Sequence, residues 1–174
     1  RIFGSLFGLL TLTVIYFWLR SEKRSWAYYS SLVFLLTLPI IKKMRFPNLD
    51  MPLMAFIFLS LSFYWQAFKK DKIRDWLLCG LFFGLALLTK GPMGMIVPLV
   101  IFVHILSERK WDIFKSYKVY SGFLAGIMVF SSYLVSLYLA GKFHIFLKYW
   151  DFTMNFTIKD GRGESSPIYT YIAF

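Results

Sequence analysis

Apolar runs alternate with short charged segments along most of the chain. A helix rises about 1.5 Å per residue, so a run of roughly 20 apolar residues covers the hydrocarbon core of a membrane. The pattern therefore predicts an all-α, polytopic transmembrane helix bundle with about six spans. We place the predicted spans at Ile2–Leu19, Trp26–Ile41, Leu53–Phe68, Trp76–Thr89, Met93–Leu106 and Val119–Ala140.

The pattern changes after Gly141, where polar residues recur at the spacing of one helical stripe. These residues are His144, Lys148, Asp151 and Asn155. The stripe predicts an interfacial amphipathic helix, which lies along the membrane face or extends the sixth span. A simple interfacial anchor is the plainer interpretation of the same stripe.

The composition supports a membrane protein. Of the 174 residues, 58% are hydrophobic, whereas soluble domains are about half apolar. The formal charge of +11 comes from 20 basic and 9 acidic residues. On a membrane protein such an excess indicates cytoplasmic loops and contacts with anionic lipid headgroups, so no nucleic acid partner is expected. The single cysteine, Cys79, lies in an apolar run, and we predict that it is a small buried packing residue.

Three of the connecting segments are basic. Segments 20–25, 69–75 and 107–118 each carry a net charge of +2, from three basic and one acidic residue in the first and four basic and two acidic residues in each of the others. Because basic loops stay on the cytoplasmic side, we predict that this face is cytoplasmic. The opposite face then holds segment 42–52, whose net charge is also +2. Either the topology is inverted or these cations have a role outside, and we favour the second interpretation.

Asp50 and Lys90 are candidate functional residues on that outer face. A carboxylate at the mouth of a helix bundle, near Arg45 and Lys90, could orient an acceptor, a metal ion or a cationic partner. A lysine at the end of a packed helix is also a good phosphate anchor. Each residue has a plainer explanation, since Asp is a common helix N-cap and a Lys before Gly91 is typical of a helix end.

The sequence predicts no cofactor. No His or Cys cluster has metal-ligand spacing, and no Walker-type or Gly-x-Gly-x-x-Gly loop is present. His104 is predicted to be interfacial and His144 to belong to the surface stripe. Whether a divalent metal is required is left open.

Two strings in the chain resemble a known enzyme family. Residues 48–53 are Asn-Leu-Asp-Met-Pro-Leu, and residues 84–98 are Gly-Leu-Ala-Leu-Leu-Thr-Lys-Gly-Pro-Met-Gly-Met-Ile-Val-Pro. One helical hairpin separates them, as in the polytopic glycosyltransferases that use lipid-phosphate sugars, the relatives of protein O-mannosyltransferase and of the aminoarabinose transferase that modifies lipid A. The tail is similar too, with Asn155, then Arg162, then Pro-x-Tyr-x-Tyr at 167–171. The resemblance covers essentially the whole chain.

The resemblance implies a C-type glycosyltransferase, which passes a sugar from a polyprenyl phosphate to an acceptor on the extracytoplasmic face. Asp50 would match the family's second acidic site residue. Lys90, Arg45 and Arg162 would match the cations that hold the donor phosphate, and Asn155 would be a further substrate-binding residue. Fixed cations stabilise the charge that develops on a leaving phosphate, and a carboxylate near the acceptor hydroxyl can serve as base or orienter.

The chain departs from the family in two respects. It begins at Arg1 directly before an apolar run and ends at Phe174 within an apolar segment. We therefore expect residues 1–174 to be an internal fragment, a partial transmembrane domain. The family's first outer loop, with the acidic residue thought to be the catalytic base, would precede Arg1, so the fragment alone is expected to be inactive. In loop 160–167, residues 164–166 are Glu-Ser-Ser where many members have His or Gly, which is the second departure from the family pattern.

We therefore predict sugar transfer from a polyprenyl-phosphate donor, of the undecaprenyl-phosphate type, to a lipid, protein or glycan acceptor. The enzyme would be a multi-pass protein of the bacterial inner membrane, surrounded by membrane lipids, and would modify lipid A, proteins or another component of the cell envelope. The alternative is a transporter or lipid flippase without glycosyl transfer. Transporters place polar groups at the bilayer midplane, whereas the charges of this chain gather at the rims of the predicted spans.

Overall fold

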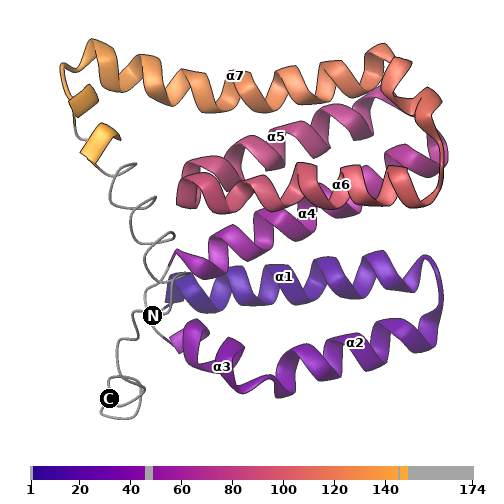
Figure 1. Ribbon diagram of the computed structural model, residues 1–174. Helices are drawn as coiled ribbons and strands as arrows, with labels where there is room; N and C mark the ends of the chain where they lie inside the picture. The colour runs from indigo at the N-terminus through magenta and orange to yellow at the C-terminus, as the bar shows by residue number, and fades with distance from the viewer. Residues whose placement is uncertain (1, 46–48, 145, 149–174) are drawn as a thin grey trace, which may run out of the picture. The chain divides into compact units, whose positions relative to one another are not determined.

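The computed structural model describes residues 2–45, 49–144 and 146–148. These residues form helices and no strand, which confirms the all-α prediction (Figure 1). The helices are α1 (Ile2–Arg20), α2 (Arg24–Leu36), α3 (Leu38–Arg45), α4 (Asp50–Lys70), α5 (Ile73–Lys90), η1 (Gly91–Met95), α6 (Ile96–Ser107), η2 (Trp111–Lys115) and α7 (Tyr117–Leu139), where η marks a 3-10 helix. The chain divides into two compact units, Arg1–Tyr133 and Leu134–Phe174.

Four segments of the described chain are long and apolar enough to cross a membrane. They are Ile2–Arg20, Asp50–Lys70, Ile73–Ser107 and Tyr117–Leu139. The third segment contains α5, η1 and α6 and is folded back on itself, because Ile105 near the end of α6 shares a buried cluster with Trp76 at the start of α5. The predicted separation of two helices near Gly91 is confirmed. The chain has the helices of a multi-pass membrane protein.

The predicted span Trp26–Ile41 is not one helix, and this prediction is corrected. Helix α2 ends at Leu36, Thr37 has an extended backbone with φ −73° and ψ 103°, and α3 begins at Leu38. Proline fits the first turn of a helix and kinks or breaks a helix interior, which agrees with a helix that begins one residue before Pro39. The result is two short helices, and neither is among the four long apolar segments.

Ion pairs join the three basic loops at one end of the first unit. Lys69 and the indole Nε1 of Trp65 both donate to the Glu22 carboxylate, the indole at 2.6 Å. Lys118 pairs with the Asp71 carboxylate and donates to the Asp71 carbonyl oxygen at 2.9 Å. The hydrogen bonds from Lys69 and Trp65 hold the pKa of Glu22 below its ordinary value, which favours the ionised form. The contacts bring the three basic loops to the same end of the unit, as their shared charge predicted.

A buried cluster joins α4, α5 and α6 near that end. Its members are Tyr64, Ala67, Trp76, Cys79 and Ile105. The hydroxyl of Ser60, on α4, donates to the carbonyl oxygen of Cys79, on α5, at 2.8 Å. Both residues are buried, so a polar group inside the bundle finds its partner on the neighbouring helix. Cys79 is a free, buried cysteine, which confirms the prediction of a packing residue.

Glycines bring α5 and α7 into backbone contact. A Cβ atom added at Gly80 would lie 1.7 Å from the carbonyl oxygen of Gly122, and one at Gly84 would lie 2.7 Å from that of Gly126. Gly80 and Gly84 on α5 have the small-xxx-small spacing that lets membrane helices approach closely, and so do Gly122 and Gly126 on α7. The spacing of Gly80 and Gly84 is recognisable in the sequence as such a face, and the structure supplies its partner face on α7.

The second unit contains the end of α7 and a short helical stretch after it. Residues 143–144 and 146–148 are helical, and the ring of Phe143 packs against those of Tyr138 and Phe146. Of the predicted polar stripe, His144 and Lys148 lie in this stretch, whereas Asp151 and Asn155 lie outside the described residues. The interfacial amphipathic helix therefore stays a prediction.

We expect Gly80→Val to destabilise the bundle, because the new side chain would displace the backbone of α7. Overpacking a tight contact costs about 1–3 kcal/mol. Thermal unfolding in detergent should show a lower Tm for this variant. The control Leu81→Ala, at a position that is 38% exposed, should change the free energy of unfolding by less than about 0.5 kcal/mol. A Gly80→Val protein as stable as wild type would contradict the contact between α5 and α7.

Candidate active site at the start of helix α4

Asp50 is the first residue of α4. The N-cap position belongs to Leu49, whose side chain makes no capping hydrogen bond, so the N-cap role considered for Asp50 is not the one it takes. A negative charge in the first turn still interacts favourably with the helix dipole. Pro52, also in this turn, is buried and sits where a helix tolerates proline. The carboxylate is left available for side chains of other helices.

A glycine turn sets the position of Lys90, the last residue of α5. Gly91 ends the helix with φ +53° and ψ −118°, a conformation that residues with a Cβ rarely adopt, and its N–H donates to the carbonyl oxygen of Leu87. A Cβ added at Gly94 would lie 2.9 Å from the backbone nitrogen of Leu87, so η1 packs directly on the last turn of α5. The predicted helix end at Lys90 is confirmed, and the turn fixes where its side chain starts.

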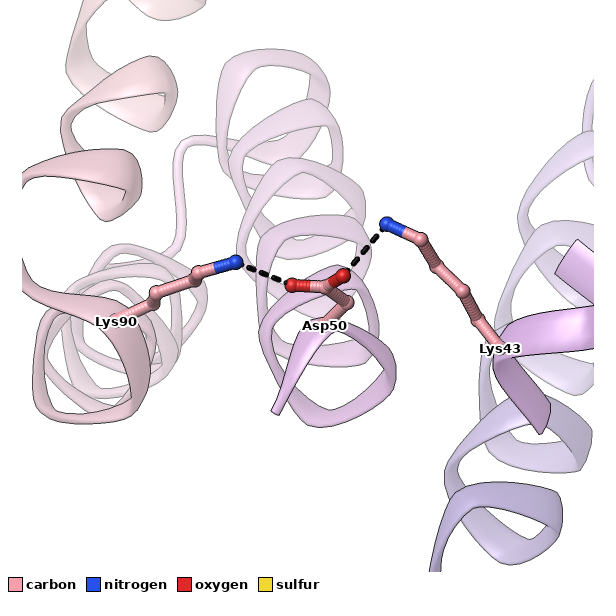
Figure 2. A network of polar contacts seen from close by, with 3 residues as sticks. All are labelled: Lys43, Asp50 and Lys90. Carbon is pink, nitrogen blue, oxygen red and sulfur yellow. Dashed lines mark hydrogen bonds and ion pairs between the residues drawn. The ribbon is translucent and has the colours of Figure 1, made fainter. Parts of the chain in front are cut away.

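Asp50 lies between two lysines from two other helices (Figure 2). The Nζ atom of Lys90 is 2.5 Å from Oδ1 of Asp50, and the Nζ atom of Lys43 is 2.5 Å from Oδ2. The carboxylate is 18% exposed, while the lysine side chains are 38% and 51% exposed. We call Lys43, Asp50 and Lys90 the lysine–aspartate cluster. Both carboxylate oxygens are engaged, and the cluster retains one unneutralised positive charge.

The position of Lys43 is set by the short helix α3, in which it lies. Because the helix is broken at Thr37, α3 does not continue in the direction of α2, and both α2 and α3 pack on α1. The Ser5 hydroxyl of α1 donates to the carbonyl oxygen of Met44 at 3.3 Å, and the Met44 side chain fills the space beside Gly8. In the sequence, Lys43 is one of the basic residues of segment 42–52, and nothing in the pattern distinguishes it from the others. Its proximity to Asp50 depends on the break between α2 and α3, which hydropathy alone did not reveal.

The structure brings together part of the predicted set. Asp50 and Lys90 are in direct contact although they are far apart in the sequence. Arg45 is the last residue of α3, and its side chain is not among the described ones. Asn155 and Arg162 lie outside the described residues. No group of three or more His, Cys, Asp or Glu side chains that could hold a metal ion occurs in the described part of the chain.

A cavity of about 370 Å³ adjoins the cluster. Beside the three charged residues it is lined by apolar side chains, Ile40, Met51, Leu53, Met54, Ile57 and Met93. Methionines adapt their shape to irregular apolar ligands. A site with cations at its rim and a flexible apolar wall fits an amphiphile with an anionic headgroup.

Comparisons with known proteins extend this description. Residues 1–135 match the family model described as dolichyl-phosphate-mannose-protein mannosyltransferase. An uncharacterized protein of Aquifex aeolicus is 28% identical over 145 residues, which cover 82% of this chain and 29% of that protein. The undecaprenyl phosphate-alpha-4-amino-4-deoxy-L-arabinose arabinosyl transferase of Erwinia tasmaniensis is 30% identical over 107 residues, or 58% of this chain and 19% of that protein. No solved structure matches the chain significantly. The chain thus spans less than a third of the length of either relative.

We expect Gly91→Ala to destabilise the turn that carries Lys90, because alanine is strained at φ +53°. Such a substitution costs more than about 1 kcal/mol. The matched control is Met95→Ala in the same 3-10 helix, at a side chain that is 56% exposed. Thermal unfolding in detergent should separate the two variants, with a lower Tm for Gly91→Ala only. Equal Tm values would contradict a turn that depends on glycine.

Proposed function

Since the chain belongs to the dolichyl-phosphate-mannose-protein mannosyltransferase family, we propose that it contributes to the active site of a membrane glycosyltransferase that uses a polyprenyl-phosphate sugar. The observation that carries the proposal is the lysine–aspartate cluster beside an apolar cavity. The cluster lies at the opposite end of α4 from the basic loops, where a lipid-linked substrate can present its headgroup.

The donor phosphate binds to Lys43 and Lys90. A sugar phosphodiester carries one negative charge, which matches the unneutralised positive charge of the cluster. When the bond between the sugar and the phosphate breaks, the leaving polyprenyl phosphate gains charge and approaches about −2. Fixed cations interact more strongly with this leaving group than with the diester, so they lower the barrier rather than only bind the substrate.

Asp50 acts on the acceptor side. Before the donor binds, each carboxylate oxygen of Asp50 faces an ammonium group. The lysines therefore occupy the positions from which a substrate hydroxyl would approach these oxygens. When the donor phosphate attracts Lys43 or Lys90, one oxygen of Asp50 is released to hydrogen-bond the acceptor hydroxyl. The carboxylate then orients the hydroxyl or accepts its proton. Donor binding would in this way prepare the acceptor site.

The reaction is a single displacement with inversion. The acceptor oxygen attacks the anomeric carbon of the sugar from the face opposite the phosphate. A new carbon–oxygen bond forms, the electron pair of the old one leaves with the phosphate, and the acceptor proton passes to a carboxylate. The first isoprene units of the donor lie against the apolar wall formed by Met51, Met54 and Ile57.

The remaining assignments complete the proposed site. Arg45 and Arg162 add cations for the donor phosphate, and Asn155 is a further substrate-binding residue. The site faces the extracytoplasmic side of a bacterial inner membrane, since the basic loops at the other end fit the cytoplasmic side. The name of the Erwinia tasmaniensis relative specifies an undecaprenyl-phosphate donor, and we extend this donor class to the present protein. The acceptor is a lipid, a protein or a glycan.

We expect Asp50→Asn and Lys90→Ala each to reduce sugar transfer by at least about 100-fold, because each removes a charge that acts on the reacting groups. Lys43→Ala should reduce transfer in the same direction. The substitutions are made in the full-length protein, and the assay measures the release of polyprenyl phosphate in membranes that contain it.

The matched control is Lys72→Ala, which removes an exposed lysine from a loop at the opposite end of the unit. It should change transfer by less than about twofold, as expected of a surface substitution. Tm values close to wild type would show that all four variants are folded. Near wild-type transfer by both Asp50→Asn and Lys90→Ala would refute the site assignment.

A further inference from the structure

A second cavity, of about 600 Å³, lies between α1 and α4. The two helices lie close together where α4 begins, with the rings of Phe7 and Phe56 5.6 Å apart, and they diverge toward the connection between α1 and α2 (Figure 1). Away from its charged residues, the cavity has apolar walls, with Val14 and Phe17 from α1 and Leu59 from α4. We call this space the α1–α4 cavity.

The mouth of the α1–α4 cavity is polar and aromatic. Glu22 bridges it, since it accepts hydrogen bonds from Lys69 and from the indole of Trp65. The Nζ atom of Lys69 also lies 4.9 Å from the centroid of the Trp65 ring, so the ammonium group is held from two sides. Lys70 lines the same mouth, is exposed, and has no ion-pair partner among the described residues. Trp18, on α1, also lines the cavity.

The charges at this mouth leave one positive charge without a partner. Lys69 and Lys70 together carry two positive charges, and Glu22 neutralises one of them. A tryptophan pair at the level of the charges, with apolar walls on one side, is the arrangement found at the boundary between headgroups and acyl chains. The neighbouring loops are also basic, which raises the local concentration of anionic lipids.

We propose that the α1–α4 cavity binds a phospholipid whose headgroup carries one negative charge. The phosphate lies at Lys70 and Lys69, the glycerol backbone lies between the two tryptophans, and an acyl chain follows the wall formed by Val14 and Leu59. Helix α4 has 21 residues, so the headgroup end of this site, at Lys69 and Lys70, is about 30 Å from Asp50. It is therefore separate from the lysine–aspartate cluster and belongs to the other membrane leaflet.

Native mass spectrometry of the purified protein, titrated with dioleoyl phosphatidylglycerol, tests the proposal. Lys70→Gln should weaken binding about fivefold, the effect of one lysine on an anionic lipid at a surface. Lys72→Gln is the matched control, because it removes a neighbouring exposed lysine that does not line the cavity. It should leave the affinity of the cavity unchanged. Equal losses in the two variants would mean that only the surface charge attracts the lipid, and would overturn the proposal.

Two further measurements test the acyl-chain and headgroup contacts. Val14→Trp fills the apolar wall and should abolish phosphatidylglycerol binding although both lysines remain; unchanged binding would overturn the proposal. Dioleoyl phosphatidylcholine should bind more weakly than phosphatidylglycerol, and equal binding would contradict the role of Lys70. The exposed substitution Lys70→Gln keeps the test valid whether or not the tryptophan variant folds.

A crosslinking experiment distinguishes a lipid from a protein segment in the cavity. A photoreactive benzophenone side chain introduced at Gln66, which lines the cavity, should crosslink to phospholipid in membranes. Crosslinks to protein alone would show that a segment of the same or another chain fills the space, and would overturn the proposal.

Discussion

The contact of one carboxylate with two ammonium groups is the interaction on which the proposed chemistry depends. Opposite charges attract weakly in water and strongly where water is scarce, and the Asp50 carboxylate is only 18% exposed. One carboxylate neutralises one lysine, so the second lysine keeps a charge that an arriving anion can neutralise. The proposed phosphate site thus combines a carboxylate held between two ammonium groups with one remaining positive charge. An isolated pair of lysines would repel each other, and a single ion pair would have no charge left for the substrate.

Interruptions of the helices place the three charged residues at one rim of the bundle. A membrane span satisfies its backbone hydrogen bonds within the helix, so breaks are confined to the rim or to protected positions. The break at Thr37 lets α3 pack on α1 and brings Lys43 to the rim. The turn at Gly91 ends α5 at the rim and so places Lys90 there. Asp50 follows the third interruption, between α3 and α4. The proposed site is therefore formed by residues that lie at or near interruptions of the helices.

Hydropathy and charge in the sequence predicted the helical class and the common end of the three basic loops. They also selected Asp50 and Lys90 as candidates, which the structure brings into contact. These features depend on local composition and on the alternation of spans. Lys43 could not be selected in the same way, because its contact with Asp50 depends on where α3 packs. The glycines of α5 were recognisable from their spacing, whereas their contact with Gly122 and Gly126 is a tertiary feature. The family resemblance in the strings around Asp50 and Lys90 is supported by the match of residues 1–135.

Differential labelling of lysine amines tests the central claim most directly, since it reports on the two ammonium groups themselves. The protein in membranes is acylated with an amine-reactive reagent, with and without undecaprenyl phosphate, and the modified sites are quantified by mass spectrometry. If the phosphate takes the place of the carboxylate, labelling of Lys43 and Lys90 falls when the lipid is present while labelling of Lys72 stays the same. Unchanged labelling of Lys43 and Lys90 at saturating lipid would contradict a phosphate site at the lysine–aspartate cluster.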